Sequence, residues 1–169
     1  MKPTSEYYSQ SFRMLLFDEL WEYEDTIKEL DRCLTENPNS NGFNNLGVAY
    51  YEIGEVENAI KNLDLAVKLN GKNGIAYINR AEINTKWEKL GNAESDFEMA
   101  IKSDSKNVSY WISRAHFYKE KGELQKALFD FKKAKRLNSN FKPVKEQITE
   151  IENELGIKSK NWFQKLIGI

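Results

Sequence analysis

Small and apolar side chains in this sequence form clusters whose members lie three or four residues apart, and the clusters recur every 34 residues. Spacings of three and four place side chains on one face of an α-helix. Such clusters at this period predict stacked pairs of antiparallel helices, in which small residues allow close approach and bulky residues fill the gaps. Five columns repeat in this way: Ala59, Ala93 and Ala127; Leu63, Phe97 and Phe131; Ala66, Ala100 and Ala134; Phe43, Tyr77 and Trp111; and Gly47, Ala81 and Ala115.

The repeat predicts an all-α fold. Polar and glycine-containing stretches separate its units, which gives about four helical hairpins, at 7–39, 40–73, 74–107 and 108–140. We expect 141–156 to form a closing helix, with Pro143 in its first turn and Gly156 at its end. The sequence thus predicts one domain over 1–156, followed by a tail over 157–169.

The first hairpin carries the weakest pattern. Its second half, 22–40, has Thr26, Leu30 and Cys33 at the positions that are small or apolar in the other units. We therefore expect Cys33 to be a small buried residue. Residues 5–20 would form the preceding helix, although Trp21 stands at the turn where another unit has Gly54.

The repeated residues resemble the tetratricopeptide repeat. The segment at 43–73 reads FNNLGVAYYEIGEVENAIKNLDLAVKLNGKN and has the family's aromatic, Leu-Gly, Tyr, turn Gly and two Ala columns. Two further copies start at Tyr77 and Trp111. The resemblance implies an α-solenoid, coiled as a right-handed superhelix, in which the first helix of each hairpin lines a concave groove.

Composition excludes most catalytic chemistry. The single Cys33 allows no internal disulfide, and the single His116 allows no histidine-based metal cluster or catalytic triad. Glycine-rich phosphate-binding loops are absent as well. We therefore expect a protein that is not an enzyme and needs no cofactor or metal.

The sequence has no apolar run of about 20 residues and no apolar stretch of signal-peptide length near its start, so we expect a cytoplasmic protein. The formal net charge is −1, but charge is unevenly distributed, with −5 over 1–39, −3 over 40–100 and +7 over 101–169. Opposite charge at the two ends favours a charged partner or head-to-tail self-association.

By the resemblance, the inward columns of the first helices form a groove for a partner. The polar members include many asparagines, whose amides can grip the main chain of an extended peptide, and Ile75, Ile78 and Ile112 could add apolar pockets. Alternatively, Asn41, Asn44 and Asn45 only cap or solubilise a helix start. The groove prediction comprises Tyr8, Phe12, Leu15, Asn41, Asn44, Asn45, Val48, Tyr51, Ile75, Ile78, Asn79, Glu82, Lys86, Ile112, Ser113, His116 and Lys119, with Ser11, Glu19, Glu52, Thr85 and Ser109 beside them.

Some tetratricopeptide-repeat proteins bind chaperone C-termini through a clamp of Lys, Asn, Asn, Lys and Arg. Here Asn45 falls in a clamp column, whereas Ser11, Leu15, Ile75 and Asn79 fill the others. Without basic residues a terminal carboxylate loses its charge-assisted hydrogen bonds, so we expect no binding of this kind.

Two further segments, one basic and one amphipathic, are candidate binding sites. Lys132, Lys133, Lys135 and Arg136 lack an interleaved aromatic platform, so we expect a solvated surface and no nucleic-acid binding. The tail could pack on its own domain, dock on a partner or touch a membrane surface, which is the weakest of the three because the segment is short. Its apolar face would consist of Trp162, Phe163, Leu166 and Ile167.

The sequence as a whole favours a scaffold or adaptor for protein–protein interaction, which binds a peptide segment of a partner in its groove. The alternative is a self-associating structural module, in which an acidic end meets a basic end. A regulatory subunit that acts in trans is a third possibility. In solution we expect a monomer or a weak homo-oligomer.

Overall fold

The computed structural model describes residues 10–87, 90–140 and 142–157, and it describes side chains over 22–87, 92–140 and 142–157. These residues form helices and contain no strand, which confirms the all-α prediction. The helices are α1 (Gln10–Glu36), α2 (Ser40–Glu52), α3 (Val56–Leu69), α4 (Gly74–Lys86), α5 (Leu90–Ser103), α6 (Val108–Glu120), α7 (Leu124–Leu137) and α8 (Lys142–Glu154).

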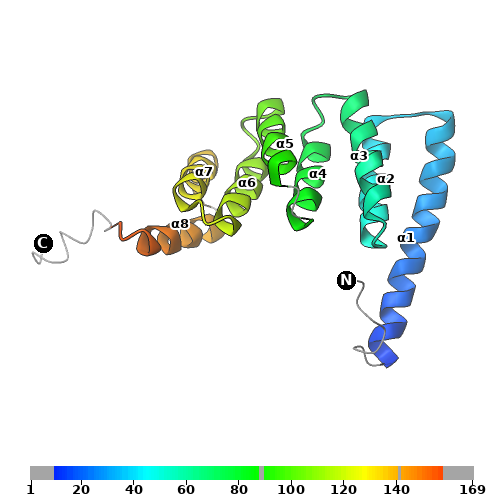
Figure 1. The fold of residues 1–169 in the computed structure, drawn as a ribbon, viewed down its shortest axis with the longest axis horizontal. Helices are drawn as coiled ribbons and strands as arrows, with labels where there is room; N and C mark the ends of the chain where they lie inside the picture. Colours follow the sequence, from blue (N-terminus) through cyan, green and yellow to red (C-terminus); the bar gives the residue numbers. More distant parts are fainter. Residues whose placement is uncertain (1–9, 88–89, 141, 158–169) are drawn as a thin grey trace, which may run out of the picture. The chain divides into compact units, whose positions relative to one another are not determined.

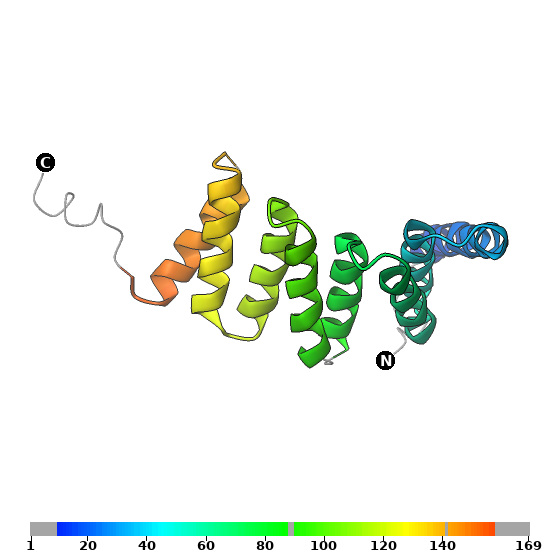
Figure 2. The same cartoon turned by 90° about the horizontal axis from the view of Figure 1, so that it is seen from above.

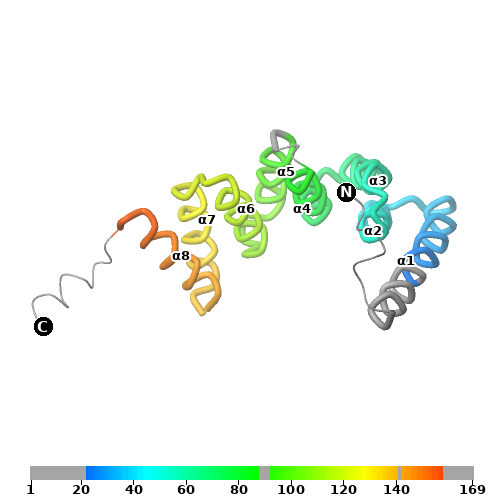
Figure 3. The backbone as a smooth tube through the Cα atoms, turned by 60° about the horizontal axis from the view of Figure 1, so that its bottom comes forward, coloured from blue at the N-terminus to red at the C-terminus, as the bar shows by residue number. Residues whose placement is uncertain are grey.

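Six of the helices pair as the repeat predicts. Helices α2 and α3, α4 and α5, and α6 and α7 form antiparallel hairpins (Figures 1 and 2). The described residues group into two compact units, one ending at Ser103 and the other starting at Asp104. In the first, α1 packs on α2 and α3 packs on α4; in the second, α7 packs on α8 (Figure 3). The single domain over 1–156 stays a prediction, and each unit is described by itself.

Helix α1 differs from the hairpin predicted over 7–39. It runs from Gln10 to Glu36 without a turn at Trp21. Two of the hairpins turn at Gly54 and Gly122, whose φ angles of 82° and 74° are costly for a residue with a Cβ atom. Trp21 provides no such glycine, but α4 and α5 are separate helices although the sequence has Glu88 at the equivalent position, so the missing glycine does not by itself explain the uninterrupted α1.

The buried face of α1 also corrects the prediction for Cys33, which is exposed. Ile27 and Leu34 are buried instead, and they pack with Leu46 and Ala49 of α2. The buried Ile27 and Leu34 therefore each lie one residue after an expected position, Thr26 and Cys33. Leu30, which is at an expected position, packs half-buried against the same cluster. Thr26 is exposed too, and its hydroxyl donates to the Glu22 carbonyl oxygen at 2.8 Å.

The three hairpins bury the predicted columns. Ala59, Leu63 and Ala66 in α3 are completely buried, and so are the matching residues of α5 and α7, apart from an exposure of 1% at two positions. Small residues at intervals of seven let the paired helices approach, while Leu63, Phe97 and Phe131 fill the space between them. These columns are therefore the core of the hairpins, whereas in the aromatic column only Tyr77 is buried, and Phe43 and Trp111 are half-buried.

Each first helix begins with the same capping residue. Asn39, Asn73 and Asn107 precede α2, α4 and α6, and their side-chain oxygens accept from the backbone N–H of Gly42, Ala76 and Ser109 at 2.8, 3.2 and 3.0 Å. These bonds satisfy N–H groups that have no partner within the helix. The caps recur every 34 residues and fix where each first helix starts.

Candidate functional site

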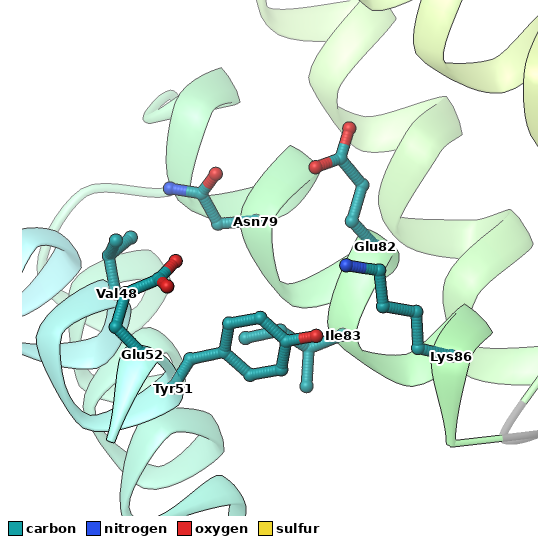
Figure 4. Close-up of a pocket in the computed structure, with 7 residues that line it drawn as sticks. All are labelled: Val48, Tyr51, Glu52, Asn79, Glu82, Ile83 and Lys86. Atoms are coloured by element: carbon teal, nitrogen blue, oxygen red, sulfur yellow. The ribbon is translucent and has the colours of Figure 1, made fainter. Parts of the chain in front are cut away.

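The first unit has a solvent-open hollow between the first helices of two neighbouring hairpins. Helix α2 contributes three residues and α4 contributes four, around a volume of about 170 Å³ (Figure 4). The lining residues are Val48, Tyr51, Glu52, Asn79, Glu82, Ile83 and Lys86. All except Ile83 were predicted groove residues, so the structure brings six of them together. Their role in binding a partner stays a prediction.

Ile83 was missed because its side chain, with an exposure of 4%, belongs mainly to the core. It lies four residues after Asn79, so the two side chains follow one another on the same face of α4. That spacing was the available signal. Together with Val48 and the ring of Tyr51, Ile83 gives the hollow its apolar part.

Lys86 and Tyr51 form one wall of the hollow. The Lys86 Nζ atom lies 5.3 Å from the centroid of the Tyr51 ring, which is the geometry of a cation–π contact. The Tyr51 hydroxyl raises the pKa of Lys86 above its ordinary value, and the Glu82 and Glu52 carboxylates add smaller effects in the same direction. The ammonium group is therefore charged at neutral pH and is already surrounded by groups that stabilise its charge.

The asparagines of this surface bind one another. Asn79 Nδ2 donates to Asn44 Oδ1 at 2.8 Å, and Asn44 Nδ2 donates to Asn45 Oδ1 at 3.2 Å. Asn44 is buried. This chain of amides links α4 to α2, so Asn44 has a structural role that neither alternative from the sequence foresaw.

Asn41 takes part in a second link. Asn73 Nδ2 donates to Asn41 Oδ1 at 3.2 Å and to Ser40 Oγ at 2.8 Å. Of the alternative that Asn41, Asn44 and Asn45 cap or solubilise a helix start, the capping part is wrong, because Asn39 is the cap of α2. Asn45 remains exposed.

The two isoleucines predicted in α4 have different environments. Ile75 is 56% exposed, whereas Ile78 is only 9% exposed and belongs to the core. Ile78 does not line the hollow between α2 and α4.

The predicted groove residues of α6 lie in the second unit. The His116 ring packs edge-on against Phe131, with 5.2 Å between centroids. Lys119 Nζ donates to Gln147 Oε1 and Glu150 Oε2 of α8, at 2.9 Å each. Ile112 and Ser113 are half-buried on the same helix. Helix α8 thus engages the cation that was expected to face a partner.

Several predicted residues lie outside the described side chains. Tyr8 precedes α1, while Phe12 and Leu15 fall in the part of α1 for which only the helix is described. The tail residues Trp162, Phe163, Leu166 and Ile167 also lie outside the described range.

The sequence reading missed two buried ion pairs. Arg80 Nε and Nη2 donate to Asp96 at 2.8 and 2.6 Å, and Arg114 Nε and Nη2 donate to Asp130 at 2.7 and 2.9 Å. Hydrogen bonds to Asp96 are the main reason that the pKa of Arg80 is raised. Both pairs join the two helices of one hairpin and recur after 34 residues, which was the signal that could have revealed them.

Over the residues that the structure covers, His, Cys, Asp and Glu side chains nowhere gather in a group of three or more that could hold a metal ion. In the same residues, none of the helices has the length and apolarity needed to cross a membrane.

Comparison with known proteins agrees with this architecture. Residues 41–73 and 108–141 match the sequence profile of the family described as "Tetratricopeptide repeat". These segments contain α2–α3 and α6–α7, the first and third hairpins. Among curated proteins, none matches the sequence.

Solved structures share the fold. "Crystal structure of MamA" superposes with a TM-score of 0.71 at 20% identity, over 89% of this chain and 87% of that chain. "First TPR of Spaghetti (RPAP3) bound to HSP90 peptide SRMEEVD" gives 0.64 at 19% identity, over 70% and 94%. "Arabidopsis OM64 TPR domain" gives 0.61 at 27% identity, over 68% and 95%.

Proposed function

Because this chain is a tetratricopeptide-repeat protein, we propose that it is a non-enzymatic scaffold that binds a peptide segment of another protein on the inner face of α2 and α4. The observation that carries this proposal is the hollow between the two helices, where apolar and charged side chains lie together and remain open to solvent. Sites with an apolar floor and a few polar groups are typical of ligand recognition. A similar fold in the RPAP3 structure holds a peptide, which supports a peptide as the ligand.

Replacing Val48 by arginine tests the proposal. Val48 lines the hollow and is half-buried, so a long cationic side chain at this position would fill the space that a bound segment needs. We expect partner affinity to fall by at least about ten-fold, or about 1.4 kcal/mol, with little change in melting temperature. The partner is isolated by cross-linking in the native host, purified, and titrated calorimetrically against both proteins.

Leu65→Arg is the matched control. Leu65 lies on α3, is 41% exposed and does not line the hollow. It introduces the same side chain elsewhere in the same unit. If Val48→Arg and Leu65→Arg bind the purified partner as tightly as the wild type, the inner face of α2 and α4 is not the binding surface.

Self-association is the second candidate function, and the charge distribution favours it. The sequence up to Ser103 has 11 basic and 18 acidic side chains, whereas the sequence from Asp104 has 14 and 8. If opposite charges drive assembly, the weight-average mass measured by sedimentation should fall to that of the monomer between low salt and about 0.5 M salt, because salt screens exposed charges. A monomer at every salt concentration would exclude this candidate.

A further inference from the structure

The hollow between α2 and α4 offers more hydrogen-bond acceptors than donors. The Asn79 amide nitrogen is bound to Asn44, which leaves its oxygen on the side of the hollow. The Glu52 and Glu82 carboxylates, both on exposed residues, also border the space (Figure 4). Acceptors at the rim suit a ligand that supplies N–H or ammonium donors.

The only cation that lines the hollow in the described part of the chain is Lys86, and its charge is compensated locally. Its ammonium group lies over the Tyr51 ring at 5.3 Å, and both carboxylates act on it electrostatically. With two carboxylates and one ammonium group, the lining carries a net negative charge. An additional anion would face Glu52 and Glu82 without a cation dedicated to it.

The same surface has an apolar part that a purely polar ligand would leave empty. Val48, Ile83 and the Tyr51 ring line the same space as the charged groups. A peptide that packs on this apolar part and also pairs with the Glu52 and Glu82 carboxylates needs an aliphatic or aromatic side chain next to a cationic one. The stem of a Lys or Arg side chain can cover apolar surface while its charged end reaches the rim.

We infer that the α2–α4 hollow selects peptide segments in which a Lys or Arg lies beside an aliphatic or aromatic residue, and that it discriminates against acidic segments and free C-terminal carboxylates. This inference rests on the proposed function and specifies the chemistry of its ligand.

The test measures fluorescence anisotropy of labelled peptides with the full chain. Three probes are compared: a capped seven-residue peptide of alternating leucine and lysine, the same peptide with glutamate in place of lysine, and this glutamate peptide with a free C-terminus. We expect the lysine peptide to bind at least about ten-fold more tightly than either acidic probe, because complementary charges favour it and like charges oppose the others.

Variants of Glu52 connect this preference to the hollow. Within the described part of the chain, the exposed Glu52 side chain makes no hydrogen bond or ion pair, so its replacement disturbs the fold little. Glu52→Gln should weaken binding of the lysine peptide about three-fold, and Glu52→Lys about ten-fold. The preference for the lysine peptide over the acidic probes would then become smaller or reverse. Glu98→Lys makes the same change of charge as Glu52→Lys, at an exposed site on α5, and should leave the preference for the lysine peptide unchanged.

The outcomes separate this inference from the proposed function. Binding of either glutamate peptide that is as tight as that of the lysine peptide, and that Val48→Arg abolishes, overturns the inference but supports peptide binding in the hollow. Lysine-peptide binding that is equal in the Glu52→Lys and Glu98→Lys variants overturns the inference, since the attraction is then not local. No binding of the lysine peptide at 1 mM overturns it as well.

Discussion

Asp130→Ala is expected to lower the free energy of unfolding of the second unit by about 3–5 kcal/mol. The Asp130 side chain is 1% exposed and accepts two hydrogen bonds from Arg114, whose side chain is 14% exposed. Removing the carboxylate leaves the guanidinium charge in a place that water reaches poorly. Because whole domains have only about 5–15 kcal/mol of stability, such a loss is large. Urea unfolding followed by circular dichroism, with amide hydrogen exchange of α6 and α7, measures it.

An exposed ion pair of the same unit provides the control. Lys142 and Glu146 are 3.7 Å apart with side-chain exposures of 85% and 64%, so Glu146→Ala should cost less than about 0.5 kcal/mol. If Asp130→Ala costs no more than Glu146→Ala, the buried pair does not stabilise the hairpin.

The chain itself suggests how to remove the pair without a large penalty. Two repeats before Arg114 and Asp130, the equivalent positions hold Leu46 and Asn62, and Asn62 donates to the Asn58 carbonyl oxygen at 2.8 Å. The double variant Arg114→Leu/Asp130→Asn therefore copies a pair that this fold already accommodates. We expect it to be more stable than Asp130→Ala, because no uncompensated charge stays buried.

The sequence predicted the repeated hairpins well because their packing is periodic. Small residues such as Ala59 and bulky ones such as Leu63 recur in every hairpin, and each occupies the same buried place. Helix α1 has neither a turn glycine nor neighbours that repeat its pattern. Its buried face depends on contact with α2, and for that reason the sequence placed Cys33 wrongly.

The candidate site was predictable as a surface but not as a network. The resemblance to the tetratricopeptide repeat placed Val48, Tyr51 and Lys86 on the inner side of neighbouring first helices. Which amide binds which depends on distances between helices: Asn44 and Asn79 are 35 residues apart, so they do not share a column. Polar columns such as Asn39, Asn73 and Asn107 do keep the interval of 34 residues, and they were overlooked because the search followed apolar residues.

Gly47→Leu is expected to cost about 3 kcal/mol or more in the first unit, at the upper end for overpacked cores. A Cβ atom at Gly47 would lie 2.8 Å from Leu63 Cγ and 3.0 Å from the Ala59 carbonyl oxygen. The backbone atom cannot move aside as a flexible side chain can, so α2 and α3 must separate. Gly71→Leu is the control, since its nearest neighbour would be the Val67 carbonyl oxygen at 3.9 Å, and we expect an effect within about 0.5 kcal/mol. Equal unfolding midpoints in urea for the two variants would contradict the close approach.

A double-mutant cycle identifies the packing partner at this contact. The later hairpins combine Ala81 with Phe97 and Ala115 with Phe131, whereas this one combines Gly47 with Leu63. Gly47→Ala gains about 1 kcal/mol in helix propensity and loses about 1–3 kcal/mol in overpacking, so we expect a modest net loss. Leu63→Phe restores the combination of the other hairpins. The free energy of unfolding of the Gly47→Ala/Leu63→Phe variant should therefore be about 0.5–2 kcal/mol higher than the value obtained by adding the effects of the two single changes. Simple additivity would mean that the Ala59 carbonyl oxygen, and not Leu63, limits the approach of α2 to α3.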